Sequence, residues 1–197
     1  MTLYTTTLPD AELFNDNSDD FWVFAYGSLM WKPDFEFTDR QPAVLSNYCR
    51  ALCIYSWVHR GTQESPGLVF GLHRGNALGN IHCQGVAFKI PPHAQTAAVE
   101  MLRARELVTN VYQEAQGPIE LTGDAPRQVN ALFYTAVEDH DQYAGTLSHE
   151  TLVRFVRQGV GGSGNNIDYV LATFDQLEAE GIDDPVLAKL CADLRER

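Results

Sequence analysis

The chain has 197 residues, with 14 Lys and Arg against 26 Asp and Glu, so its formal net charge is −12. This length is typical of one domain, since domains run to about 100–200 residues. Hydrophobic residues make up 45% and aromatic residues 11% of the chain, which excludes a disordered protein. The acidic balance argues against nucleic acid and against an anionic membrane surface as partners, because both need clustered Lys and Arg.

The N-terminal residues predict a lead-in rather than a targeting segment. Residues 1–20 are polar and acidic and contain no apolar stretch of signal-peptide length, so we expect a flexible acidic lead-in followed by a single domain over residues 21–197. No apolar run is long enough to cross a bilayer, so no membrane insertion is expected.

The cysteines indicate a reduced compartment. Four cysteines in a chain of this length form no secreted-type disulfide framework, so we expect a cytoplasmic protein. Cys49, Cys53, His82 and Cys83 do not form two well-spaced ligand pairs, and we therefore expect no metal site.

Short segments rich in β-branched and aromatic residues predict strands over most of the first half of the chain. Gly, Pro, Asn or polar turns separate these segments, as is usual for strands. The predicted strands cover residues 21–25, 43–48, 51–57, 68–72, 84–90 and 129–137.

Apolar residues at helical spacing predict a helix over residues 94–108, after Pro91 and Pro92, and three more helices near the C-terminus. Ser148 can cap the first of these, Asn165 or Asn166 the second, and Asp184 the third, which begins at Pro185. The order of elements favours an α+β fold with a helical C-terminal tail. Five or six short strands in such a chain would most readily curl into a partly closed β-barrel.

Residues 159–164 match the pattern G-x-G-x-x-G that binds dinucleotides. That pattern requires a strand before it and a helix after it, whereas a predicted helix precedes it here. We therefore expect an inter-helix loop and no nucleotide cofactor, although its backbone N–H groups can still hold an anion.

Two further features carry chemistry, and each has an ordinary alternative. Tyr26, Gly27 and Ser28 follow the first predicted strand, where exposed amides can bind a carboxylate or an oxyanion; a simple turn is the alternative. Glu106 extends the apolar line of Ala98 and Leu102 near the end of its helix, where burial and the helix dipole raise a carboxyl pKa. A surface glutamate paired with an arginine explains the same spacing.

Taken together and in order, these segments resemble the ChaC-like gamma-glutamylcyclotransferases that act on glutathione. The matching segments run from the first predicted strand to the helical tail: residues 22–33, Arg50, residues 59–62, Pro66 and Gly67, residues 85–88, Arg105 and Glu106, Tyr112, Tyr143, residues 162–165 and Tyr169. Two positions depart from the family pattern: Ala25 stands where a glycine is usual, and residues 108–111 replace a glycine-richer stretch.

The resemblance implies a small mixed β-barrel with flanking helices, glutathione as the substrate, and no cofactor. It implies that Glu106 is the catalytic acid and base. The implied substrate-binding residues are Ala25, Tyr26, Gly27, Ser28, Leu29, Met30, Arg50 and Tyr143.

The implied reaction closes the glutamyl group of glutathione into 5-oxoproline and releases Cys-Gly. The α-amine attacks the γ-carbonyl of the same molecule, so the nucleophile is already tethered, and a base with a raised pKa can accept its proton. Two alternatives remain open: the same reaction on other gamma-glutamyl amines or amino acids, and a non-catalytic binding or regulatory protein with this fold.

Overall fold

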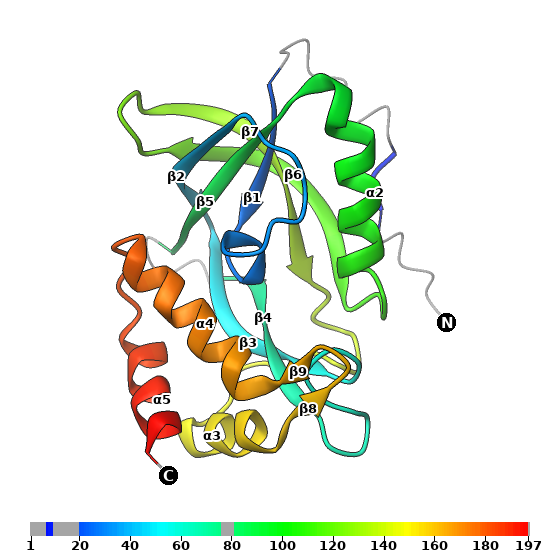
Figure 1. Cartoon of the computed structure of the whole chain (residues 1–197), viewed down its shortest axis with the longest axis vertical. Coiled ribbons are helices and arrows are strands. Elements are labelled where there is room, and N and C mark those ends of the chain that lie inside the picture. Colours follow the sequence, from blue (N-terminus) through cyan, green and yellow to red (C-terminus); the bar gives the residue numbers. More distant parts are fainter. Residues whose placement is uncertain (1–6, 10–19, 76–80, 197) are drawn as a thin grey trace. The chain divides into compact units, whose positions relative to one another are not determined.

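The computed structural model describes residues 7–9, 20–75 and 81–196 (Figure 1). The chain forms two compact units. The first, which we call the barrel unit, contains Met1–Cys49 and Leu72–Val137; the second, the helical unit, contains Arg50–Gly71 and Glu138–Arg197. The acidic lead-in predicted for residues 1–20 lies largely outside the described residues, and that prediction and the single domain over 21–197 remain predictions.

Within the described residues, the barrel unit is a closed barrel of five strands in the order β1-β5-β2-β6-β7 (Figure 1). The strands are β1 (Phe21–Ala25), β2 (Asp39–Ser46), β5 (His82–Ile90), β6 (Tyr112–Leu121) and β7 (Arg127–Ala136). Neighbouring strands are antiparallel except β1 and β7, which pair in parallel at Trp22 with Ala131 and Val23 with Leu132. The mixed barrel is therefore confirmed, and it is closed where we expected partial closure.

The barrel core explains why the sequence pattern of β1 is continuously apolar. All five residues of β1 are buried, because both of its edges are paired and neither face meets solvent. Phe24 and Phe88 are each 1% exposed and Trp22 is fully buried. This burial of large side chains makes β1 the rigid base from which the next segment of the chain leaves.

The strand β6 was not predicted. Its sequence contains Gly117 and Pro118 and two glutamates, a composition depleted in strands. Pairing along its whole length, from Tyr112 opposite Ala136 to Leu121 opposite Arg127, outweighs that weak local preference. Two strands therefore stand between the first helix and the helical tail, where we expected one.

The helix predicted over residues 94–108 is the single-turn η2 (Pro92–Ala94) followed by α2 (Gln95–Glu106). Ala98, Val99 and Leu102 form its buried face. Ala98 and Leu102 lie on the predicted apolar line, whereas Val99 was not part of that prediction and Ala97, which was, is exposed. The helix ends at Glu106, so Val108 lies outside it and is 51% exposed. Ion pairing of Arg103 with Glu114 places α2 beside β6.

The helical unit contains the three predicted C-terminal helices, α3 (His149–Gln158), α4 (Asn166–Ala179) and α5 (Pro185–Arg195) (Figure 1). Their first turns are capped by the side chains of Ser148, Asn165 and Asp184. The structure thus selects Asn165 over Asn166 as the cap of α4. Asn166 is instead fully buried and bonds to the backbone of β4 (Gly67–Arg74), which pairs with β3 (Tyr48–Ser56).

The G-x-G-x-x-G segment forms the two-residue strands β8 (Val160–Gly161) and β9 (Gly164–Asn165) between α3 and α4. A Cβ at Gly161 would lie 2.6 Å from the Gly61 nitrogen, and Gly164 has a φ of 102°. The glycines therefore serve close packing and a tight turn. The preceding element is a helix, as predicted, so the strand–loop–helix context of a dinucleotide site is missing here.

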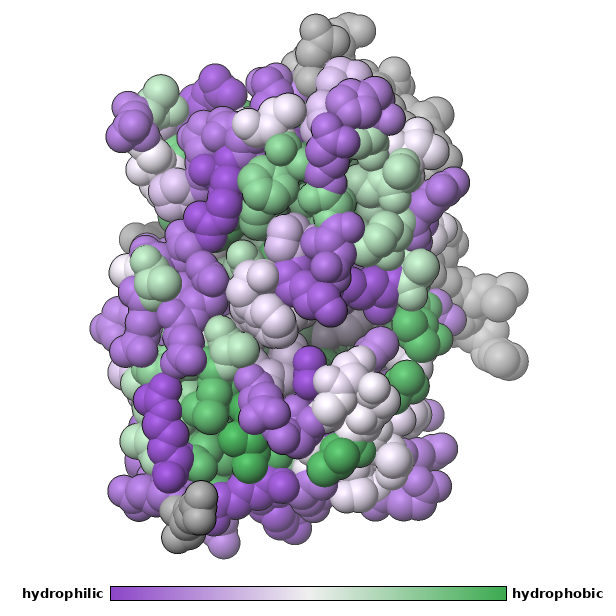
Figure 2. All heavy atoms as spheres, viewed as in Figure 1, coloured by the Kyte–Doolittle hydropathy of each residue, from purple (hydrophilic) through white to green (hydrophobic). Residues whose placement is uncertain are grey.

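Polar side chains cover most of the face seen in Figure 2, with smaller apolar areas between them. Across the described ranges, no helix has both the length and the apolar character needed to span a membrane.

Candidate active site

The chain turns sharply where β1 ends. Residues after Ala25 form the 3₁₀ turn η1 (Ser28–Met30), in which the Met30 amide donates to the Gly27 carbonyl at 2.9 Å and the Lys32 amide to the Ser28 carbonyl at 2.8 Å. Leu29 and Met30 are buried and anchor the turn, while Ser28 stays partly exposed. The Ser28 side chain therefore stands at the end of a fully buried strand.

The φ of Gly27 is −135°, which is outside the left-handed region, so no positive φ requires a glycine at this position.

Tyr26 ties the start of the turn to the neighbouring strand β7. Its side chain is 8% exposed, and its hydroxyl donates to the Tyr134 carbonyl oxygen on β7 at 2.9 Å. The Tyr26 side chain therefore links the end of β1 to β7 within the barrel unit.

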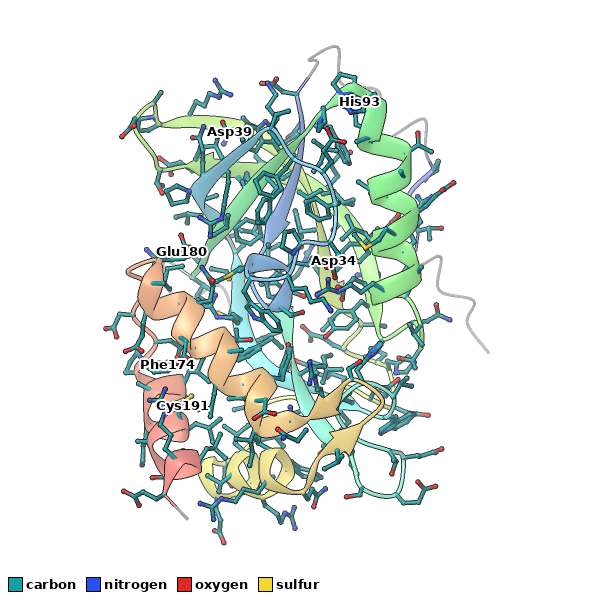
Figure 3. All side chains as sticks on the ribbon, viewed as in Figure 1. Asp34, Asp39, His93, Phe174, Glu180 and Cys191 are labelled. Carbon is teal, nitrogen blue, oxygen red and sulfur yellow. The ribbon has the colours of Figure 1, made fainter. Side chains whose placement is uncertain are left out.

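Arg105 links the segment after β1 to the end of α2. Its Nη2 donates to Ser28 Oγ at 2.9 Å, and its Nη1 donates to the Lys32 carbonyl at 2.7 Å and to Asp34 Oδ2 at 3.2 Å. Asp34, which Figure 3 labels, has a φ of 57°, a conformation that a short polar side chain tolerates. The structure therefore brings Ser28 and the C-terminal end of α2 together.

Glu106 is the last residue of α2, and its side chain is 19% exposed. Burial raises the pKa of its carboxyl group, and the adjacent Arg105 guanidinium, whose Nε lies 3.3 Å from Glu106 Oε1, opposes part of that rise. The two explanations left open by the spacing are both partly right: Glu106 pairs with an arginine, and its pKa is nevertheless raised. A carboxylate with a raised pKa can accept and return a proton.

A second carboxylate lies close by with a different environment. Glu114 on β6 has a fully buried side chain and accepts hydrogen bonds from Arg103 Nε at 2.8 Å, Tyr134 Oη at 3.0 Å and the Leu8 amide at 2.8 Å. Burial raises the pKa of Tyr134, and the carboxylates of Glu114 and Glu106 raise it further. Tyr134 therefore stays protonated; its hydroxyl is bonded to Glu114, and the charge of Glu106 also acts on it.

Arg50 and Tyr143 lie in the helical unit. The Arg50 side chain is 7% exposed, and its Nη2 lies 3.8 Å from Oδ2 of Asp184, the cap of α5. Tyr143 pairs with Ile54 through an isolated β-bridge, and burial raises the pKa of its hydroxyl. A role of either residue in substrate binding remains a prediction.

Cys49, Cys53, Cys83 and Cys191 are all free thiols, and burial raises the pKa of Cys53 to about 12. Among the residues that the structure describes, no group of three or more His, Cys, Asp and Glu side chains is placed to hold a metal ion.

Sequence reasoning did not assign roles to Arg105, Asp34 or Tyr134. Arg105 adjoins Glu106, and that adjacency is a usable signal for a charge that modulates the carboxylate. Its contact with Ser28 spans 77 positions, and no local pattern in the chain predicts a contact at that separation.

Comparison with known proteins gives consistent matches over most of the chain. A relative from Danio rerio named glutathione-specific gamma-glutamylcyclotransferase 1 is 32% identical over 175 residues, with 88% of each chain covered. The human protein of the same name is 30% identical, covering 88% of this chain and 78% of its own. The Escherichia coli K12 protein named glutathione-specific gamma-glutamylcyclotransferase is 28% identical, covering 89% and 73%.

The fold agrees with a solved structure. A yeast gamma-glutamyl cyclotransferase specific to glutathione superposes with a TM-score of 0.79 at 23% identity, covering 91% of this chain and 97% of its own, which shows a shared fold. The family model described as ChaC-like protein matches residues 21–197, a span that holds the barrel, the η1 turn, Arg105 and Glu106. The chain belongs to the ChaC-like protein family.

Proposed function

We propose that this protein is a glutathione-specific gamma-glutamylcyclotransferase that converts glutathione to 5-oxoproline and Cys-Gly. The observation that carries the proposal is the Glu106 carboxylate, which has a raised pKa and ends the helix whose Arg105 is bonded to the η1 turn. Membership of the ChaC-like family and the names of the relatives support the choice of substrate.

The reaction needs no external nucleophile. The α-amine nitrogen of the glutamyl group forms a bond to its own γ-carbonyl carbon and closes a five-membered ring, and the amide bond to cysteine breaks. Holding a tethered nucleophile close to the carbonyl carbon replaces a bimolecular encounter, and such positioning supplies several kcal/mol, out of a maximum of about 7–11 kcal/mol.

Glu106 moves the protons in this mechanism. The α-amine is largely an ammonium below its ordinary pKa of about 7.7–8.0, so it must lose a proton before it attacks. The Glu106 carboxylate accepts that proton and then donates to the departing nitrogen of Cys-Gly. The protons lost by the attacking amine end on the leaving amine, so no water is consumed and the atoms balance.

The η1 turn binds the gamma-glutamyl group in this proposal. The Ser28 hydroxyl and the amides of residues 27–29 anchor the substrate carboxylate or stabilise negative charge that develops on the γ-carbonyl oxygen. The buried strand β1 and the hydrogen bond from Tyr26 to Tyr134 support this role, because a site needs donors that are held in place before the substrate arrives.

The test is a substrate panel in which both products are measured. The purified protein is incubated with glutathione, with several gamma-glutamyl amino acids, and with N-acetyl-glutathione, and 5-oxoproline and Cys-Gly or the free amino acid are quantified. We expect equal amounts of 5-oxoproline and Cys-Gly from glutathione and none from N-acetyl-glutathione, whose nitrogen cannot attack.

The panel separates the alternatives. Faster turnover of a gamma-glutamyl amino acid than of glutathione would show that the preferred substrate is not glutathione, while the cyclisation reaction would stay as proposed. Absence of 5-oxoproline from every substrate would overturn the proposal and favour a binding protein with the same fold. Hydrolysis to free glutamate would point to a different chemistry.

We place this activity in the cytoplasm. Glutathione is a major component of the thiol pool that keeps cytosolic thiols reduced, so the proposed substrate is abundant there. Fractionation of cells that express the tagged chain would test the location.

A further inference from the structure

We propose that Arg105 is a positioning residue, which holds the 28–34 segment against the end of α2 and orients the Glu106 carboxylate toward it. The inference rests on the proposed function, because it assigns the η1 turn to substrate binding and Glu106 to proton transfer.

The geometry of the guanidinium carries the inference. Arg105 contacts three groups of the 28–34 segment, namely Ser28 Oγ at 2.9 Å, the Lys32 carbonyl at 2.7 Å and Asp34 Oδ2 at 3.2 Å. Its remaining nitrogen, Nε, lies 3.3 Å from Glu106 Oε1. All three nitrogens of one planar group are therefore used, and they join the turn to the carboxylate.

The residue type matters for this arrangement. Arginine presents several donors in a fixed plane, whereas lysine is a single flexible point charge. A lysine at position 105 would keep the positive charge near Glu106 but cannot reach Ser28, Asp34 and Glu106 at the same time. Charge and positioning can therefore be separated by comparing lysine with an uncharged residue of similar length.

The same guanidinium affects the charge state of Glu106. The titratable and charged groups around this carboxylate are Arg105 on α2, Tyr134 on β7 and, across Arg105, Lys32 and Asp34. Tyr134 in turn contacts Glu114, which pairs with Arg103. Because Arg105 favours the carboxylate, its removal should raise the pKa of Glu106 and move the acidic limb of the kcat profile to higher pH.

The experiment compares Arg105→Met and Arg105→Lys with wild type, by kcat and KM for glutathione over a range of pH. We expect Arg105→Met to lower kcat by about 100-fold, since a displacement of about 1 Å costs that much, and to shift the acidic limb upward. Arg105→Lys should lose only about tenfold in kcat, because an ammonium group replaces some but not all of the contacts of the guanidinium, while its acidic limb stays near that of wild type.

A control variant and a double-mutant cycle exclude general damage to the fold as the cause of lost activity. Arg127→Met removes another barrel-unit arginine, which is 51% exposed and pairs with Asp20, and should leave kcat and KM unchanged. If Arg105→Met does not fold, Arg105→Lys is combined with Ser28→Ala. Because Ser28 accepts a bond from Arg105, the two kcat losses should be less than multiplicative.

A readout that needs no turnover separates this inference from the proposed function. The Glu106 carboxyl is titrated by NMR in ¹³C-labelled protein and assigned with Glu106→Gln; its pKa should rise in Arg105→Met and not in Arg105→Lys. Wild-type kcat in Arg105→Lys, or an unchanged Glu106 titration in Arg105→Met, would overturn the role of Arg105. Inactivity of the wild type toward glutathione would overturn the proposed function, and the NMR titration would still decide the role of Arg105.

Discussion

The barrel unit contains two carboxylates whose surroundings suit them to different tasks. Glu114 has a fully buried side chain and is held by Arg103, Tyr134 and the Leu8 amide at 2.8–3.0 Å. Glu106 is 19% exposed, and the Arg105 nitrogen that faces it lies 3.3 Å away. A carboxylate held by several close donors is a structural anchor, whereas one with a raised pKa and access to solvent can exchange protons. We therefore assign the chemistry to Glu106.

Glu106→Gln tests this assignment directly. Glutamine keeps the size and hydrogen bonding of the side chain but cannot accept the proton, so kcat for glutathione should fall about 10²–10⁴-fold, the usual contribution of a positioned base. Glutathione binding, measured by calorimetry, should persist. Glu100→Gln, an exposed change on the same helix, serves as the matched control and should behave as wild type. A Glu106→Gln enzyme within tenfold of wild type would remove Glu106 from the mechanism.

The raised pKa of Glu106 also predicts how stability depends on pH. Between the ordinary pKa of a glutamate and its raised value in the folded protein, the folded state binds more protons than the unfolded state, so stability falls as pH rises. Each kcal/mol of stability lost in this way corresponds to about 2–4 °C in Tm for a protein of this size. Glu106→Gln should therefore melt a few degrees higher than wild type at pH 7.5, and the difference should vanish below pH ~4. Equal Tm values at pH 7.5 would contradict the raised pKa.

At the scale of elements, side chains at the helix ends connect the helices to distant segments of the chain. The end of α2 places Arg105 and Glu106, and the start of α4 ties that helix to β4 through Asn166. In both cases a polar side chain at a helix terminus bonds to a segment distant in sequence. Such contacts fix the angle between the helix and its neighbour. Packing of apolar faces alone allows a wider range of angles.

The η1 turn has a prediction of its own. If amides of residues 27–29 hold the gamma-glutamyl group, Gly27→Val should raise KM, lower kcat, or both, by at least tenfold, because added bulk blocks close approach to the backbone. Ser28→Ala should cost about 0.5–1.5 kcal/mol, a two- to tenfold effect, as expected for one hydrogen bond. An inert, folded Ser28→Ala enzyme together with an acyl adduct trapped on wild-type Ser28 would replace single-step cyclisation by a covalent mechanism.

Asn166 at the start of α4 predicts a large stability effect. Its Oδ1 accepts from the Leu68 amide at 2.6 Å and its Nδ2 donates to the Leu68 carbonyl at 2.7 Å, both in a buried environment. Asn166→Ala leaves two buried backbone groups without partners, so it should lower the free energy of unfolding by about 2–4 kcal/mol. Asn165→Ala removes only the exposed cap and should cost about 1 kcal/mol. Urea denaturation of both variants gives the comparison, and equal losses would contradict the bridging role of Asn166.

At the scale of the whole molecule, the chain is acidic and forms two compact units that alternate along the sequence. The residues proposed for the chemistry all come from the barrel unit, whereas Arg50 and Tyr143 come from the helical unit. Each of the strands β3 and β4 contributes residues to both units, so two of the three boundaries between the units fall within strands.

The proposed reaction predicts that activity is independent of added metals. The attacking amine is part of the substrate and Glu106 moves the proton, so each step is supplied by the substrate and this chain. Dialysis against a chelator should therefore leave kcat unchanged, measured as 5-oxoproline release. A clear loss that zinc restores would return attention to Cys49, Cys53, His82 and Cys83.

The sequence by itself determined the features that depend on neighbouring residues. The continuous apolar run of β1, the caps Ser148 and Asp184, and the buried line from Ala98 to Leu102 all follow from local periodicity and backbone capping, and the structure confirms them. The resemblance to a known family added Glu106 and the 25–30 turn as site residues, which composition and spacing alone left undecided.

Only the tertiary structure decided the features that depend on contacts between distant segments. Pairing with β7 makes a strand of β6 despite Gly117 and Pro118, and parallel pairing of β1 with β7 closes the barrel. Asn166 binds β4 because the fold buries it there, while its neighbour Asn165 caps the helix. Arg105 reaches Ser28 across 77 positions because the barrel brings the end of α2 to the turn after β1, and pairing of that kind is set by the packed chain rather than by local preference.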